Sequence, residues 1–376
     1  MGREKFLYVV DSLDRFGATV QLDLLTAEIA REHEVHVVVL CGSNRLAAND
    51  ARTVHCLEAD LGPTSAISGN GLSWRRLAQA GWKLHRRVQE IGPTIVHAWG
   101  ERAEQIALLG LWNVKVRKFV TRTDVILTDR IVTELARKKL GEDVEKYIVT
   151  HEEVKKSMVA QRYDASKFEV VAGTTLSNPQ SDRETARKQL LEIGGIPANS
   201  KIAATVAPLN PRSRLKDLIW ATDLLTCIRD DVHLFIFGRG SQRWRLKKFA
   251  SQTEAGHHIH FVDCEMDAVD LIPGVDFYWQ SHLREPLSPA LMYAMHCGVP
   301  AISVYGPGTA DVIGHQETGF AANFGARDEF ARWTKYLLEQ TESGNQLARQ
   351  GKESLVGKFT VEQTAAGWLQ LYQAGQ

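Results

Sequence analysis

One block in the C-terminal half constrains the fold more than any other part of the chain. It begins at Glu285, continues as an apolar helical stretch closed by Gly298, and leads into the β-branched run Val299–Val304. A glycine-rich turn at Gly306–Gly308 follows, with a short helix predicted behind it. A buried strand between two helices is typical of a parallel sheet, whose carboxyl edge gathers backbone N–H groups and helix N-termini. Such an edge suits phosphorylated ligands, and a carboxylate beside it suits sugar hydroxyls.

Size and charge bound the function classes. The chain has 376 residues, of which 44% are hydrophobic and 24% charged, so two domains with buried cores are predicted. Lys+Arg and Asp+Glu both total 45. This balance argues against a generally basic nucleic-acid binder, and we expect no nucleic-acid partner.

The cysteines and the length of the apolar runs indicate the cellular compartment of the protein. The five cysteines are odd in number and scattered without a Cys-x-x-Cys pair, so neither a disulfide framework nor a structural zinc site is expected. No apolar run approaches the roughly 20 residues of a spanning helix, and a strand at the N-terminus stands where a signal peptide would. We therefore predict a cytoplasmic protein.

The chain alternates strands and helices in both halves, which predicts an α/β fold with parallel sheets. A run of turn formers at Ala172–Asp182 separates the halves and is interpreted as a linker. Strands are predicted at Lys5–Val10, Glu34–Leu40, Thr94–Ala98, Arg117–Thr121, Lys146–Thr150, Ile202–Ala207, His233–Phe237, Ile259–Val262, Val275–Trp279 and Val299–Val304. Helices are predicted at Val20–Arg31, Trp74–Glu90, Glu184–Glu192, Leu215–Ile228, Trp244–Ser251, Asp328–Glu339 and Val361–Tyr372.

Three segments resemble the group 1 glycosyltransferases (family 4) of the GT-B fold. They are Glu285 with Ala294–Pro300, Tyr305–Ile313 with Glu317–Phe320, and Phe16–Ala18. The resemblance implies two Rossmann-like domains facing across a cleft, an acceptor-side domain at 1–175 and a nucleotide-sugar domain at 176–355. It also implies a terminal helix at 356–376 that crosses back to the first domain.

The resemblance implies a donor site in the second domain. Glu285 matches the glutamate that contacts the donor sugar, and the family's second glutamate falls on Tyr293, a residue that could instead be core packing. The family's diphosphate-neutralising Arg and Lys fall on Pro208 and Ser213, so nearby arginines are the alternative cations, unless they are only solvated surface charges. The implied donor-binding residues are Arg212, Arg214, Arg239, Arg284, Ser288, Tyr293, Gly306, Gly308, Thr309 and Ala310, with the base near Val262 and Asp263.

The acceptor side is implied in the first domain. Gly17 and Ala18 would let backbone amides approach a ligand, and Asp124 would line the cleft unless it is an ordinary loop residue. His97 and Trp99 occupy the positions of a His-x-His pair in the family, and Trp99 would either stack on a sugar or fill its space.

The resemblance implies a retaining, metal-independent glycosyltransferase with no bound cofactor, acting on a nucleotide-sugar donor and a saccharide or lipid-linked acceptor. The altered positions leave an alternative, a catalytically degenerate relative that binds a ligand or partner, and a GT-B epimerase lacks a matching constellation. His257, His258 and His260 lack a nearby fourth ligand, which argues against a metal site. The basic helix Trp74–Glu90 suits either solvent or weak peripheral contact with a membrane.

Overall fold

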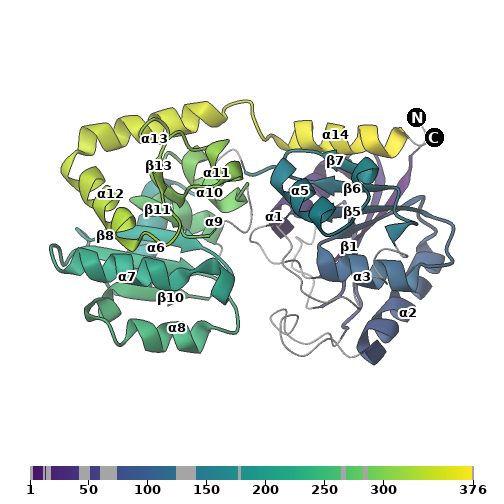
Figure 1. The fold of residues 1–376 in the computed structure, drawn as a ribbon, viewed down its shortest axis with the longest axis horizontal. Coiled ribbons are helices and arrows are strands. Elements are labelled where there is room, and N and C mark those ends of the chain that lie inside the picture. The colour runs from purple at the N-terminus through teal and green to yellow at the C-terminus, as the bar shows by residue number, and fades with distance from the viewer. Residues whose placement is uncertain are drawn as a thin grey trace. The chain divides into compact units, whose positions relative to one another are not determined.

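The computed structural model describes residues 3–11, 13, 18–41, 51–59, 74–123, 141–176, 179–263, 268–282 and 287–374. The chain divides into two compact units. Unit 1 runs to Thr174 and takes in the chain again from Phe359, whereas unit 2 contains Thr175–Lys358. Each unit is built around one parallel sheet with helices on both faces (Figure 1).

Unit 1 has a seven-stranded sheet in the order β3-β2-β1-β4-β5-β6-β7. All of its paired strands run parallel. The strands are β1 (Lys5–Val10), β2 (Glu34–Val39), β3 (Thr53–Cys56), β4 (Ile95–Trp99), β5 (Arg117–Arg122), β6 (Lys146–Val149) and β7 (Phe168–Val170). The described helices are α1 (Ala18–Ile29), α2 (Trp74–Ile91), α3 (Glu101–Gly110), α5 (Glu152–Ala160), the 3-10 helix η2 (Ala165–Lys167) and α14 (Val361–Gln373).

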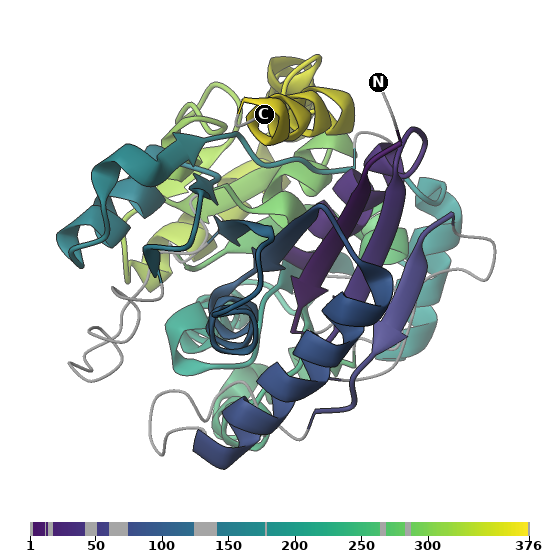
Figure 2. The same ribbon diagram turned by 90° about the vertical axis from the view of Figure 1, so that its right-hand side faces the viewer.

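Two separate hydrophobic cores cover the two faces of this sheet. Residues of α2, α3 and α5 share one core, and residues of α1 and α14 share the other (Figure 2). Helices α2 and α3 approach closely at Gly81 and Gly110, where a Cβ on Gly110 would lie 2.4 Å from the Gly81 carbonyl oxygen. Only glycine fits this contact, so it sets the spacing of the two helices.

Unit 2 has a six-stranded sheet in the order β10-β9-β8-β11-β12-β13, again with all pairs parallel. Its strands are β8 (Lys201–Val206), β9 (Val232–Phe237), β10 (Ile259–Val262), β11 (Phe277–Gln280), β12 (Ala301–Val304) and β13 (Phe320–Ala322). Its helices are α6 (Arg183–Gly194), α7 (Leu215–Thr226), α8 (Arg243–Ala250), α9 (Ala268–Leu271), α10 (Pro289–His296), α11 (Pro307–Ala310), α12 (Arg327–Glu339) and α13 (Thr341–Leu355), with 3-10 helices η3 (Pro211–Ser213), η4 (Glu254–His258) and η5 (Ile272–Gly274).

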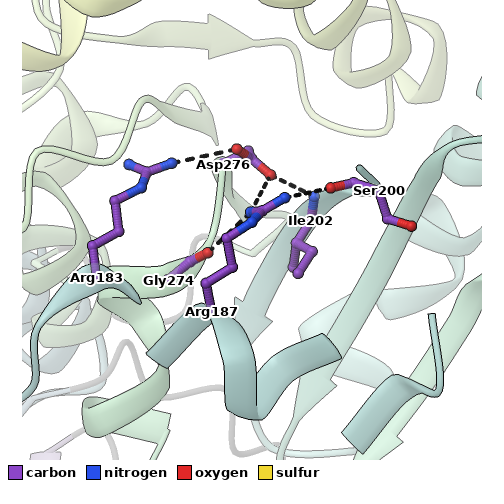
Figure 3. Close-up of polar contacts among 6 residues, drawn as sticks. All are labelled: Arg183, Arg187, Ser200, Ile202, Gly274 and Asp276. Carbon is purple, nitrogen blue, oxygen red and sulfur yellow. Dashed lines mark hydrogen bonds and ion pairs between the residues drawn. The ribbon is translucent and has the colours of Figure 1, made fainter. Parts of the chain in front are cut away.

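An ion-pair network anchors α6 at the amino edge of this sheet (Figure 3). The carboxylate of Asp276 accepts hydrogen bonds from Arg187 at 2.9 Å and from the Ile202 backbone N–H at 2.9 Å. Arg183 lies 3.4 Å from the same carboxylate, and Arg187 also donates to the Ser200 carbonyl. Because these contacts tie β8, β11 and α6 at the amino edge, the opposite edge is left to position loops.

Several element boundaries differ from the sequence-based prediction, among them those of β11 and α10. Strand β11 begins two residues later than predicted because Asp276 turns into the network above, and it extends to Gln280. Helix α10 begins at Pro289 with Ser288 as its cap, while Glu285 lies outside the described residues. Within the described part of the chain, no helix combines the length and apolarity needed to cross a bilayer.

Candidate functional site

The strand order of unit 2 reverses between β8 and β11. From β8 the chain builds outward through β9 and β10 on one side, and through β11, β12 and β13 on the other. In open parallel sheets, ligands bind outside the carboxyl ends of the strands at such a switch point. The loops that follow β8, β9, β11 and β12 therefore define the candidate site.

Backbone contacts hold three of these loops together. The Leu209 N–H donates to the Arg239 carbonyl at 2.8 Å, which joins the loops after β8 and β9. A Cβ at Gly238 would lie 1.9 Å from the Ala207 carbonyl oxygen, so this approach requires glycine. The Ser281 hydroxyl donates to the Ser213 carbonyl at 2.8 Å and adds the loop after β11.

The predicted cations have different environments. Arg212 and Arg239 lie exposed on the adjoining loops after β8 and β9. The guanidinium of Arg214 instead pairs with Asp217 at 2.6 Å and lies 4.3 Å over the Phe324 ring. Arg284 lies outside the described residues. The structure thus brings Arg212 and Arg239 to one edge and ties Arg214 into a local network.

The loop after β10 carries an ion pair at the predicted base-binding position. Val262 is the buried last residue of β10, and the carboxylate of Asp263 lies 2.7 Å from Arg243. Arg243 is the first residue of α8, and its guanidinium also donates to the Phe261 carbonyl. Arg243 was absent from the sequence-based site because a cation in the first turn of a helix carries no motif.

Helices α10 and α11 both start at the same edge. The Ser288 hydroxyl caps α10 by accepting from the Leu291 N–H at 3.4 Å. Helix α11 follows Gly306 directly, without a side-chain cap, and contains Gly308, Thr309 and Ala310. Thr309 is buried. The four predicted residues of this turn are therefore grouped at the carboxyl end of β12.

Tyr293 lies inside unit 2. Its hydroxyl donates to the Val269 carbonyl at 2.9 Å and accepts from the Gln180 N–H at 3.0 Å. Burial raises the pKa of this phenol well above its usual value. These two backbone partners join α10 to α9 and to the segment before α6.

A polar side chain that the sequence-based site did not include lies at the switch point. Gln280, the last residue of β11, is 1% exposed. Neither its amide oxygen nor its amide nitrogen has a hydrogen-bond partner among the described residues. In register beside it on β12 is Ser303, which is also buried. The sequence feature that could have identified Gln280 is a glutamine at the end of an otherwise apolar strand.

Unit 1 has its own switch point, between β1 and β4. Gly100, at φ +88°, lets α3 begin directly after β4. Arg102 in the first turn of α3 then pairs with Asp11, which follows β1, at 3.1 Å. On the next strand, the buried guanidinium of Arg122 pairs with the buried carboxylate of Glu104. None of these four charged residues was predicted.

His97 and Trp99 are buried under the terminal helix. His97 shares a hydrogen bond with the Tyr372 hydroxyl and another, of 2.8 Å, with the Thr121 hydroxyl. Burial lowers the pKa of His97 to about 3, so the imidazole is neutral near pH 7. The Trp99 ring packs on Trp368 with 5.1 Å between centroids. The structure thus gives both residues contacts with α14.

Of the three remaining residues predicted on the acceptor side, the structure describes one. Gly17 and Asp124 lie outside the described residues, and Ala18 is the first residue of α1. Among the described residues, no group of three or more His, Cys, Asp or Glu side chains is arranged to hold a metal ion. His260 instead contacts His233, with 3.2 Å between ring nitrogens.

The fold and site define a GT-B protein with two Rossmann-like units. Its fold is similar to that of Alr3699/HepE from Anabaena in complex with UDP and glucose, with a TM-score of 0.83, 16% identity, and coverage of 98% of this chain and 99% of the other. Residues 186–354, which lie in unit 2, match the family model of glycosyl transferases group 1. The family match therefore describes unit 2, and it covers less than half of the chain.

Two curated relatives match part of the chain. The lipopolysaccharide core biosynthesis glycosyltransferase LpsE of Rhizobium meliloti is 26% identical over 175 residues, which are 46% of this chain and 50% of the relative. The N-acetyl-alpha-D-glucosaminyl L-malate synthase of Bacillus anthracis is 23% identical over 185 residues, or 49% and 48%. The match thus spans about half the length of either relative.

Proposed function

We propose that the chain is a glycosyltransferase that moves a sugar from a nucleotide-sugar donor to a saccharide or lipid-linked acceptor. The observation that carries the proposal is that the group 1 match falls on unit 2, whose switch point gathers two exposed arginines and a glycine-rich turn. Departure of a nucleoside diphosphate builds negative charge, which cations and backbone N–H groups stabilise.

The roles follow from charge and position. Arg212 and Arg239 would neutralise the leaving diphosphate, with Arg214 and Arg284 as further cations, and the turn Gly306–Ala310 would offer N–H groups. Glu285 would hold the sugar hydroxyls. Ser288 would act as a helix cap at the sugar end, and the Val262–Asp263 segment would meet the base. Because guanidinium groups supply the positive charge, the reaction would need neither a metal ion nor another cofactor, and it would retain configuration as the family resemblance implies.

The donor and the acceptor are proposed by chemical class. The Anabaena neighbour was solved with UDP and glucose, so UDP-glucose is the first donor to test. We place the acceptor in unit 1, as the family resemblance implies. There, the charged residues Asp11 and Arg102 would meet it, together with Gly17, Ala18 and Asp124.

A weak peripheral contact with a membrane is also proposed, in a protein of the cytoplasm. Helix α2 exposes Trp82, and the Arg86 guanidinium lies 5.2 Å from its ring centroid. Arg75 is exposed on the same helix. An exposed tryptophan among arginines suits the interface of an anionic bilayer, where a lipid-linked acceptor would be found.

The proposal is tested by donor hydrolysis and binding with UDP-, GDP- and ADP-glucose. Replacing the sugar-holding carboxylate in Glu285→Gln should lower turnover on the order of 10²–10³-fold, since an interaction made in the transition state is lost. The exposed Glu192→Gln is the control and should retain turnover. If the wild type binds one of these ligands without hydrolysing or transferring the sugar, the chain is the degenerate binding protein. If it binds none, the proposed activity is wrong.

A further inference from the structure

An unpartnered amide lies buried at the switch point of unit 2. Gln280 is 1% exposed, and both polar atoms of its side chain lack a hydrogen-bond partner among the described residues. Leaving a buried polar group unpaired is unfavourable, because the group has lost its hydrogen bonds to water, so native structures rarely contain one without a reason. An apolar residue would serve packing better at this position.

The register shows which side of the sheet Gln280 faces. Phe277 and Trp279 belong to the core shared with α7 and α12, and successive strand residues alternate sides. Gln280 therefore faces the other side, which α10 covers. Ser303 pairs with it on β12, and Ser288 caps α10 above the same edge.

The neighbouring strand completes the location. Phe277 pairs with Ala203 and Tyr278 with Ala204. Continued for two residues, this register brings Gln280 beside Val206, the last residue of β8. The amide thus lies between the carboxyl ends of the two strands where the topology reverses, which is where ligands bind in parallel sheets.

We propose that Gln280 is a specificity-determining residue that binds hydroxyl groups of the sugar carried by the nucleotide donor. A primary amide both donates and accepts hydrogen bonds, as a pair of neighbouring sugar hydroxyls does, whereas a diphosphate would use only its donor half. This inference rests on the proposed function. It adds an uncharged side chain, five residues before Glu285 in the sequence, that hydrogen-bonds to the sugar.

The test compares Gln280→Met with Thr334→Val. Thr334, on α12, is also fully buried, and its hydroxyl likewise lacks a partner among the described residues, but α12 covers the opposite face of the sheet. Both substitutions remove an unsatisfied polar group at nearly constant volume, so both variants should melt at the wild-type temperature or above it. Only Gln280→Met should affect sugar binding.

Calorimetry would measure binding of UDP, GDP and ADP and of their glucose conjugates. Gln280→Met should bind the nucleotide sugar at least about tenfold more weakly than wild type, with the nucleoside diphosphate affinity unchanged. Equal affinity of wild type and Gln280→Met for the sugar conjugate overturns the inference while leaving the proposed function intact. So does an equal loss for both ligands, which would place Gln280 against the nucleotide. A wild type that binds none of the six ligands overturns both.

Discussion

At the scale of single residues, charge at a sheet edge has two different uses. Arg212 and Arg239 are exposed on loops of unit 2, whereas Arg122 of unit 1 is buried with Glu104. In the sequence each is an arginine at or just beyond a strand end. Burial separates them, because a buried guanidinium must be paired inside the protein, whereas an exposed one can be reached from solvent.

The buried pair makes a stability prediction. Arg122→Met would leave the Glu104 carboxylate without its partner, and it should destabilise the protein by about 3–5 kcal/mol. The double variant Arg122→Met/Glu104→Leu should recover most of that loss, because two apolar side chains replace two charges. Urea unfolding followed by circular dichroism measures both variants.

The exposed pair of Arg31 and Glu28 is the matched control, and Arg31→Met should change stability little. A double variant as unstable as Arg122→Met alone would show that the charges, and not merely their pairing, are required.

At the scale of elements, three histidines link β9, η4 and β10. His233 lies 3.2 Å from His260 between ring nitrogens, and its ring centroid is 4.6 Å from that of His258. Burial, followed by the neighbouring histidines, lowers the pKa of His233 to about 4, and burial followed by His258 does the same for His260. Asp231 acts on His233 in the opposite sense.

The sign of the resulting pH dependence follows from these pKa values. An unfolded histidine titrates near pH 6.5, so between pH 6.5 and 4 the unfolded chain binds protons that the folded cluster does not. The stability from keeping the cluster neutral is complete above pH 6.5 and is lost as the pH falls towards 4. We expect His260→Gln to lose less stability than wild type over this interval, by at most about 1 kcal/mol per pH unit.

Melting temperatures of both proteins at pH 7.5 and pH 5 would measure this. His97, with a pKa of about 3, is present in both and contributes equally. Parallel losses in the two proteins would rule out the cluster as the source.

Local sequence pattern predicts some features of the helices and strands and not others. Strand β1 begins and ends where its apolar run predicts, because its side chains alternate between two cores. The loops around Arg212 and Gly306 were predicted to lie at one edge because parallel topology requires it. His97 was different, since its hydroxyl partner Tyr372 is 275 residues away in the chain. A contact over that separation is not encoded in a local window of the sequence.

At the scale of the whole molecule, the chain returns from unit 2 to unit 1 after Lys358, so the C-terminal residues belong to unit 1. Helix α14 follows α13 of unit 2 directly in sequence, yet it packs against α1. Its Trp368 and Tyr372 are buried in the unit 1 core with Tyr8. The stability of unit 1 should therefore depend on the last residues of the chain.

This dependence predicts a local response to Trp368→Ala. Truncating a buried tryptophan typically costs about 3–5 kcal/mol, and here the cavity would open against β1 and β4. Because the unit 2 core shares no residue with it, hydrogen exchange should accelerate in β1 and β4 and remain unchanged in β8 and β9. Mass spectrometry of exchanged peptides measures both sets in one experiment, with the exposed Trp244→Ala as control. Equal acceleration in β8 and β9 would mean that the two units unfold as one and that α14 stabilises the entire chain.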